Sequence, residues 1–294
     1  MHNTIHYLIG IDGGGTRTRI QLADPSGRPL AYAECGPSAL GQGVDKAWRE
    51  IATGLDAVFA QLKVSGIPFH HCAVGAGLSG VNNASWARHF HDAAPAFAAL
   101  SLASDAYTAL LGAHDGGAGA IVIVGTGSIG LAQFTDGRRV ETGGWGFPSG
   151  DEASGAWLGL HAIALAQRTL DGRASQTAFT RELIAQCGGS DAALLDWLGR
   201  AGQAEYATLA PVVVRHAQHD VQAQALMQRA GQEIAAMARA MDADEALPLA
   251  LCGGLSTVMA DYLPDALKVR TMPPRHDAVY GALLLAKQAA NQSS

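Results

Sequence analysis

The sequence predicts an α/β protein made of two related halves. One observation is a repeated pattern: an apolar run, a glycine-rich loop, an alternating segment and a turn occur at the start of the chain and again near its middle. A second is that helix-length segments and short apolar runs follow each copy, as expected for mixed α/β domains. A third is that the chain has 36 glycines, and they cluster in the loops that end the apolar runs.

The first half begins with a predicted antiparallel meander. His6–Ile11 is a short apolar run, and after the loop residues 16–23 alternate between apolar and polar types. A period of two indicates a strand rather than a helix. Asp24–Gly27 reads Asp-Pro-Ser-Gly, a sequence suited to a tight turn, and Pro29–Glu34 can return as a third strand.

The second half repeats this meander. Ala120–Val124 is an apolar strand, Gly125–Ser128 is the loop and Ile129–Phe134 is the next strand. Asp136-Gly137 forms the turn, and Arg139–Thr142 forms the third strand. Two copies of one pattern predict a duplicated domain.

Helical and strand segments alternate along the rest of the chain. Asp151 is expected to cap a helix that Asp171-Gly172 ends, and Pro211 is expected to kink a later helix or lie in its first turn. Pro273-Pro274 separates the last strand from the last helix. The expected helices are 44–62, 84–91, one from about 107, 152–169, 174–186, 192–200, 204–218, 221–241 and 276–290, and the expected strands are 71–75, 100–103, 247–252 and 267–272.

Composition excludes several classes of protein. Apolar residues make up 48% and charged residues 16%, which excludes a disordered chain. The net charge of −6 argues against nucleic acid or an anionic membrane as a partner. No apolar run approaches the roughly 18–20 residues of a membrane helix, and the start lacks a secretion signal, so a cytoplasmic protein is expected.

The cysteines and histidines do not predict a structural metal. The four cysteines are far apart with no C-x-x-C pair, which indicates reduced, mostly buried thiols. The 11 histidines form no H-E-x-x-H motif and have no cysteine or carboxylate partner at a familiar zinc spacing.

The glycine loop after the first strand fits a hairpin that binds phosphate. Gly10 to Gly15 has Walker A spacing, but Thr16 stands where that motif requires lysine. The Rossmann fingerprint fails because its third glycine is missing and a strand follows. Backbone N–H groups of a hairpin can hold phosphate without lysine. Asp12 is then expected to hold Mg²⁺, directly or through water; a plain hairpin is the alternative.

Three motifs together resemble a known superfamily. Gly10–Thr16, Gly125–Ser128 and Leu251–Leu255 are similar to the phosphate-1, phosphate-2 and adenosine motifs of the sugar kinase/Hsp70/actin fold. The nearest branch is the N-acetylglucosamine/glucosamine kinases of the BadF/BadG/BcrA/BcrD ATPase family. The resemblance covers essentially the whole chain, including Gly77–Gly80, Ser104–Ala106 and Gly143–Glu152.

The resemblance implies two duplicated RNase H-like (actin-like ATPase) domains with a central cleft. The expected domains are residues 1–115 and 116–275, and a last helix at about 276–291 is expected to pack back on the first. ATP and Mg²⁺ are the implied cofactors, an amino sugar the implied substrate and a homodimer the implied assembly. The residues implied to bind the nucleotide are Gly13, Gly14, Gly15, Thr16, Gly125, Thr126, Gly127, Ser128, Gly253 and Gly254.

Asp105 is the expected catalytic residue. It follows the strand 100–103 and precedes a helix, at the sheet edge where α/β sites open. In the family, this aspartate takes the proton of the acceptor hydroxyl, and the resemblance implies the same here. A purely structural helix cap is the alternative.

The implied sugar contacts lie mostly around Trp145, whose ring can cover an apolar face of a sugar. Core packing for Trp145 and a helix cap for Asp151 are the alternatives. Where relatives commonly carry Asn, this chain has Ala39, so Ser38 substitutes or the sugar differs. The full set of expected substrate contacts is Ser38, Ser79, Gly80, Gly144, Trp145, Asp151 and Glu152.

The expected activity is ATP-dependent phosphorylation of N-acetylglucosamine or glucosamine at the 6-hydroxyl. One alternative on the same fold is an ATPase activator of an electron-transfer or dehydratase system, with an iron–sulfur cluster held at a dimer interface. Another is a non-enzymatic regulator that binds a nucleotide or sugar. Sugar-dependent release of ADP discriminates the kinase from both.

Overall fold

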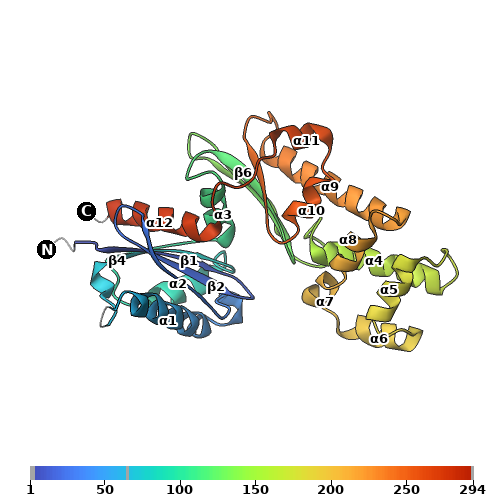
Figure 1. Ribbon diagram of the computed structural model, residues 1–294, viewed down its shortest axis with the longest axis horizontal. Helices are drawn as coiled ribbons and strands as arrows, with labels where there is room; N and C mark the ends of the chain where they lie inside the picture. The colour runs from blue at the N-terminus through green and yellow to red at the C-terminus, as the bar shows by residue number, and fades with distance from the viewer. Residues whose placement is uncertain (1–3, 64–65, 293–294) are drawn as a thin grey trace. The chain divides into compact units, whose positions relative to one another are not determined.

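The computed structural model describes residues 4–63 and 66–292, and its contacts divide the chain into two units (Figure 1). Unit 1 runs to Gly117 and resumes at Pro274. Unit 2 is the continuous segment from Ala118 to Pro273. The chain therefore passes from one unit to the other twice.

Unit 1 contains a five-stranded mixed sheet in the order β3-β2-β1-β4-β5. The central strand β1 (Tyr7–Gly13) pairs antiparallel with β2 (Thr18–Ala23) and parallel with β4 (Cys72–Leu78). β3 (Pro29–Cys35) and β5 (Ala99–Ala103) form the edges. The antiparallel meander predicted for the first half is confirmed.

Helices cover both faces of this sheet (Figure 1). α1 (Val44–Gln61) and α2 (Ala84–Asp92) share a core with Ile9, Ile11 and other strand residues on one face. α12 (Ala278–Gln292) packs on the other face and against α3 (Asp105–Ala113), so the end of the chain completes the unit that its beginning starts. The 3₁₀ turns η1 (Leu40–Gln42) and η2 (Phe69–His71) precede α1 and β4.

Two glycines allow α12 to lie directly on the sheet. A Cβ atom at Gly75 would lie 2.1 Å from the carbonyl oxygen of Ala282, and one at Gly10 would lie 2.6 Å from that of Val279. Both distances are well inside van der Waals contact, and the close-packed interior leaves α12 no room to shift away. Glycine at positions 10 and 75 thus determines how closely α12 packs on β1 and β4.

Unit 2 repeats the meander in a four-stranded sheet of order β8-β7-β6-β9. β6 (Gly119–Val124) pairs antiparallel with β7 (Ser128–Gln133), β7 with β8 (Arg139–Gly143), and β6 parallel with β9 (Leu249–Cys252). The predicted duplication is confirmed, because β1 to β3 and β6 to β8 have the same pairing order.

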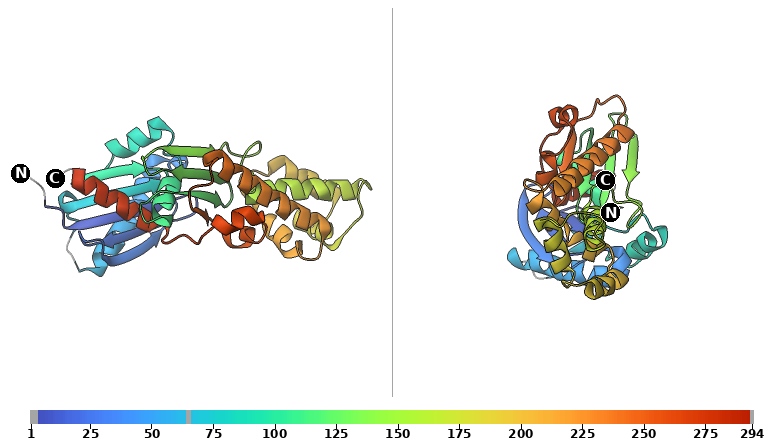
Figure 2. Two further views of the ribbon diagram at one scale, coloured as in Figure 1. Left: turned by 90° about the horizontal axis from the view of Figure 1, so that it is seen from above. Right: turned by 90° about the vertical axis from the view of Figure 1, so that its right-hand side faces the viewer.

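Unit 2 carries most of the helices, and Figure 2 shows α4 to α9 gathered beside its sheet. They share a core of buried, mostly aliphatic residues with β6 and β9. The helices are α4 (Gly155–Leu170), α5 (Ala178–Gln186), α6 (Asp191–Arg200), α7 (Gln203–Ala207), α8 (Ala210–His216), α9 (Val221–Met241), α10 (Ser256–Ala260) and α11 (Asp265–Arg270).

The strand expected at 267–272 is wrong. This segment forms α11, which begins after Pro264 and has Lys268 and Arg270 in its last turn, a favourable place for positive charge. A single parallel bridge from Thr271 to Leu249 remains where the fifth strand was expected.

Two helix starts also differ from expectation. Asp151 does not cap the helix after it: α4 begins at Gly155, and the Ser154 hydroxyl accepts the N–H of Trp157 as its cap. The helix expected at 204–218 is divided into α7 and α8, and Pro211 lies in the first turn of α8. Proline suits that position because the first helical N–H groups have no partner within the helix.

Among the residues the structure describes, no helix has both the length and the apolar character to span a bilayer.

Candidate functional site

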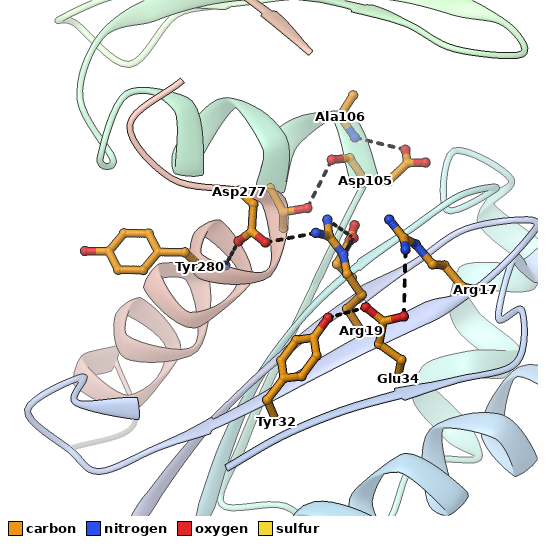
Figure 3. Close-up of polar contacts among 10 residues, drawn as sticks. Arg17, Arg19, Tyr32, Glu34, Asp105, Ala106, Asp277 and Tyr280 are labelled. Atoms are coloured by element: carbon orange, nitrogen blue, oxygen red, sulfur yellow. Dashed lines mark hydrogen bonds and ion pairs between the residues drawn. The ribbon is translucent and has the colours of Figure 1, made fainter. Parts of the chain in front are cut away.

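In unit 1, a network of three charged side chains lies at the end of β1 (Figure 3). Asp12 and Arg19 face each other across the β1–β2 hairpin. Nε and Nη2 of Arg19 donate to Oδ2 of Asp12 at 2.9 and 2.7 Å, and Nη1 donates to Oδ2 of Asp277 at 2.9 Å. Asp277 precedes α12, so this network joins two segments 258 positions apart.

Burial raises the pKa of Asp12, although the neighbouring Arg19 guanidinium opposes this effect. Burial alone would lower the pKa of Arg19, but the carboxylates of Asp12 and Asp277 raise it overall. The site therefore keeps a negative charge in a poorly solvated place and neutralises it only in part. A cation bound near Asp12 would favour its ionised form.

Asp105 is the first residue of α3, and the N-cap is its neighbour Ser104. The Ser104 hydroxyl accepts the N–H of Tyr107 at 3.1 Å. Oδ1 of Asp105 accepts the N–H of Ala106 at 2.9 Å (Figure 3). Burial raises the pKa of Asp105, and the negative charge of Asp12 raises it further. A half-buried carboxylate with a raised pKa, at the end of a sheet, is suited to accept a proton.

The loop Gly13–Thr16 follows β1. A Cβ at Gly13 would lie 2.0 Å from Oγ of Ser38, so packing requires glycine there. At Gly14 a Cβ would meet nothing within 4 Å, and Gly15 and Thr16 are exposed. Since no packing in unit 1 demands glycine at position 14, the absence of a side chain there lets a ligand such as phosphate approach the loop closely.

Ser38 and Ser79 both lie against this loop. The N–H of Ser38 donates to the carbonyl of Gly14, and the N–H of Ser79 donates to that of Gly13. Ser38 is 1% exposed, and its Oγ accepts from Oγ1 of Thr18 at 2.7 Å. Ser79 and the following Gly80 are half-buried. The structure thus brings the two serines to the glycine loop, with Ser38 beneath it.

In unit 2, the loop Gly125–Ser128 is held against the start of α4. The N–H of Gly155 donates to the carbonyl of Gly125 at 2.8 Å, and the N–H of Ala156 donates to the carbonyl of Thr126 at 3.1 Å. The Ser128 hydroxyl donates to the carbonyl of Glu152 at 2.6 Å. Thr126 is exposed at the tip of the loop.

Asp151 supports this second loop. Its Oδ1 accepts the N–H of Ser128 at 3.2 Å, and its Oδ2 accepts Nε2 of Gln203 at 2.7 Å. Asp151 is 4% exposed and has a positive φ of 60°. A strained backbone and a carboxylate with both oxygens hydrogen-bonded are common where a site must be held rigidly.

Trp145 lies apart from that buried network within unit 2. It is 86% exposed, between Gly144 and Gly146, which both have positive φ. Its indole is therefore not part of the core of unit 2, and the packing alternative for Trp145 is not supported. An exposed indole on a glycine-rich loop is available for stacking on a ligand.

Gly253 and Gly254 follow β9 and precede α10. Gly253 has φ +90°, and a Cβ there would lie 2.4 Å from the carbonyl oxygen of Val124. That carbonyl also accepts the N–H of Leu255 at 3.0 Å. At Gly254 a Cβ would meet nothing within 4 Å. As at Gly14, unit 2 itself gives no packing reason for glycine at 254.

The residues present fit a magnesium ion of the kind that binds with a nucleotide. Magnesium in phosphoryl-transfer sites is held by one or two carboxylates and the substrate phosphates, rather than by a full protein cage. Asp12 provides such a carboxylate, because Arg19 bonds to Oδ2 and not to Oδ1. Within the described part of the chain, no group of three or more His, Cys, Asp or Glu residues could hold a metal by itself.

Sequence reasoning missed Arg19, Asp277 and Gln203. Arg19 was detectable, because it lies directly opposite Asp12 in an antiparallel hairpin. Asp277 and Gln203 reach the loops from elements distant in sequence, at separations of 258 and 52 positions. No local pattern marks such contacts.

The paired sheets and their glycine hairpins define the actin-like ATPase and sugar-kinase fold. Residues 9–286 match the family model of the BadF/BadG/BcrA/BcrD ATPase family, and the chain belongs to this family.

Several known proteins are similar to this chain. Glucosamine kinase GspK of Vibrio cholerae is 30% identical over 283 residues, which cover 96% of each chain. An N-acetylmuramic acid/N-acetylglucosamine kinase of Clostridium acetobutylicum is 26% identical, over 96% of this chain and 98% of its own. The crystal structure of a proposed N-acetylglucosamine kinase from Chromobacterium violaceum has a TM-score of 0.92 and 51% identity, over 96% of this chain and 99% of that one.

Proposed function

We propose that this protein is an ATP-dependent kinase that phosphorylates glucosamine or N-acetylglucosamine at the 6-hydroxyl. The observation that carries this proposal is the position of Asp105, a half-buried carboxylate with a raised pKa that is not used as a helix cap. The named activities of the relatives from Vibrio cholerae and Clostridium acetobutylicum support an amino sugar as the substrate.

Asp105 is assigned as the general base. Phosphoryl transfer needs its acceptor hydroxyl aligned and its developing charge neutralised, and it needs a group near the acceptor that takes the proton. In the proposed reaction, the carboxylate of Asp105 accepts the proton of the 6-hydroxyl as the oxygen bonds to the γ-phosphorus of ATP. The bond from that phosphorus to the β-phosphate oxygen breaks, and ADP leaves.

The glycine loops are assigned to the nucleotide. The loops Gly13–Thr16 and Gly125–Ser128 bind phosphate oxygens, and Gly253–Gly254 borders the adenosine. The N–H groups of Gly14, Gly125 and Ser128 already donate within the protein, so those of Gly15, Thr16, Thr126 and Gly127 are assigned to the phosphates. The absence of a packing reason for glycine at 14 and 254 within their own units supports close approach of a ligand. Asp12 is assigned to Mg²⁺, which supplies positive charge to the phosphates when bound.

Sugar contacts are assigned to Trp145, Gly144, Glu152, Ser79 and Gly80, with Ser38 and Asp151 behind the two loops. Each oxygen of Asp151 accepts one bond, from Ser128 or from Gln203, and in this proposal a sugar hydroxyl donates to a remaining lone pair of the carboxylate. Ser38 is buried and Ala39 has no side-chain donor or acceptor, so these two residues offer few polar groups to the 2-substituent of a sugar. Glucosamine and N-acetylglucosamine are therefore both candidates, and the assay below compares them.

The test is ADP release from Mg-ATP with glucosamine, N-acetylglucosamine, N-acetylmannosamine or glucose. Sugar-dependent turnover by the wild type, with the phosphate located on the 6-oxygen by NMR, is the expected result.

Trp145→Ala should raise KM for the sugar and leave thermal unfolding unchanged, since the indole is exposed. ADP release that no sugar stimulates would contradict the kinase assignment and favour an ATPase activator. Light scattering tests the homodimer that the family resemblance implies.

A further inference from the structure

We propose that Asp277 is a positioning residue for the metal-nucleotide site. It holds the guanidinium of Arg19 so that Arg19 bonds to one oxygen of Asp12 and leaves the other for the cation. This inference rests on the proposed function, in which Asp12 faces Mg²⁺, and it adds the helix at the end of the chain to that site.

The bonding pattern of Arg19 is the first argument. Arginine and a carboxylate commonly form two parallel bonds that use both carboxylate oxygens. Here Nε and Nη2 of Arg19 instead converge on Oδ2 of Asp12, at 2.9 and 2.7 Å. The third nitrogen of the guanidinium, Nη1, donates to Asp277 at 2.9 Å. The guanidinium is thereby kept at one side of Asp12.

The two oxygens of Asp277 have separate tasks. Oδ1 accepts the N–H of Tyr280 at 3.1 Å and so caps α12, while Oδ2 accepts Nη1 of Arg19. Figure 3 shows both bonds from the labelled Asp277. Because the tasks use different atoms, a substitution can remove one and keep the other.

The position of Asp277 is fixed by backbone contacts within unit 1. The N–H groups of Arg275 and His276 donate to the carbonyls of Ala113 and Gly112 at the end of α3, both at 3.1 Å. A Cβ at Gly112 would lie 2.0 Å from the carbonyl oxygen of Asp277. Asp277 is therefore a rigid anchor for Arg19.

The ion pair between Asp277 and Arg19 contributes more to the orientation of the guanidinium than to the stability of the fold. The side chain of Asp277 is 49% exposed, and ion pairs this exposed contribute little to folding. Without Asp277, rotation of the guanidinium can engage both oxygens of Asp12, and it then competes with a cation. Loss of a residue that orients a metal-binding side chain typically lowers metal affinity by about 10–100-fold.

The experiment measures the affinity for ADP by calorimetry, with Mg²⁺ and with EDTA, in the wild type and in Asp277→Asn. Asparagine caps a helix as well as aspartate does, so the cap is retained while the acceptor for Arg19 is lost. The expected result is that the gain in ADP affinity on adding Mg²⁺ falls about tenfold, while the affinity in EDTA is unchanged. Asp277→Ser, a second capping variant, should behave in the same way.

Tyr280→Phe is the matched control. Tyr280 lies in the first turn of α12, and its hydroxyl donates to Asp115, which follows α3. The substitution removes this bond and leaves the contacts of Arg19 unchanged. An unchanged Mg²⁺ effect in Asp277→Asn, or an equal loss in Tyr280→Phe, would overturn the inference. Asp12→Asn separates the two levels: if it also leaves the Mg²⁺ effect intact, the metal assignment of Asp12 fails together with this inference. If Asp12→Asn removes the effect and Asp277→Asn does not, this inference alone fails.

Discussion

Ser104 caps α3 and Asp105 is the first residue of the helix. Variants of these two residues therefore test the catalytic role of Asp105 and the capping role separately. Because Ser104 supplies the cap, Asp105→Asn should lower kcat by about 10²–10⁴-fold and leave the thermal midpoint unchanged or higher. Ser104→Ala should do the opposite: it should cost about 1 kcal/mol of unfolding free energy and retain most of the activity. Steady-state kinetics and urea unfolding of both variants check this pair. Equal activity losses would indicate a structural role for the whole turn.

The raised pKa of Asp105 gives a second prediction, for pH dependence. A general base must be ionised, so kcat/KM should fall as the pH drops through this raised pKa, above the usual range of an aspartate. The sign for stability is opposite. A carboxyl whose pKa is higher in the folded state favours folding at low pH, and this contribution is lost as the pH rises through the folded pKa. The acidic limb of the pH–rate profile measures the first effect; an acidic limb at the ordinary aspartate value would contradict it.

The sequence predicted the positions of Asp12 and Asp105 at the ends of strands, while their roles stay predictions. Asp12 and Asp105 each end or follow an apolar run, and such positions lie at a sheet edge. Asp277 has no such signal, because its relation to Arg19 depends on where α12 docks. Asp151 was expected as a cap, but the strained turn after it moves the helix start to Gly155.

At the scale of the element, α12 depends on glycine contacts with α3. A Cβ at Gly281 would lie 1.9 Å from the carbonyl oxygen of Thr108, which is backbone and cannot move aside cheaply. Gly281→Ala should therefore destabilise the protein by about 1–3 kcal/mol or more, measured by urea unfolding.

Gly199 in α6 is the matched control for Gly281. A Cβ there meets nothing within 4 Å, so Gly199→Ala should stabilise the protein slightly, because alanine is the better helix former. A similar loss of stability at both positions would show that close packing of α12 is not the cause.

Elements were predictable where one period dominates their residues. The meanders have a clear period of two and a turn signal, and both formed as expected. The segment 267–272 also alternates between apolar and polar residues, but it is too short for a period of two to distinguish a strand from a helix. Pro264 before it and the charges in its last turn favoured the helix, and the sheet of unit 2 has four strands as a result.

At the scale of the whole molecule, the duplication was visible in the sequence pattern, whereas the return of the last helix to the first domain was expected only from the resemblance to the family. Unit 1 is built from two separate segments, and unit 2 is one continuous insertion between them. Local patterns do not reveal which sheet a distant helix will cover. The glycines that receive α12 on β1 and β4 appear in the sequence only as interruptions of apolar runs.

This arrangement predicts that unit 1 can fold once its two segments are joined. The carbonyl of Ala113 accepts the N–H of Arg275 at 3.1 Å, so the two segments of unit 1 run side by side near Gly117 and Pro274. A short Gly/Ser linker between these residues should therefore close unit 1 without strain. The joined chain is expected to be monodisperse and to unfold cooperatively in urea.

The same chain without residues 274–292 should aggregate, because the face of the sheet that carries Leu8, Ala23 and Ala73 is then exposed to solvent. Cooperative unfolding of that shorter chain would show that α12 is dispensable for unit 1, and it would remove the structural basis for placing Asp277 at a fixed distance from Arg19.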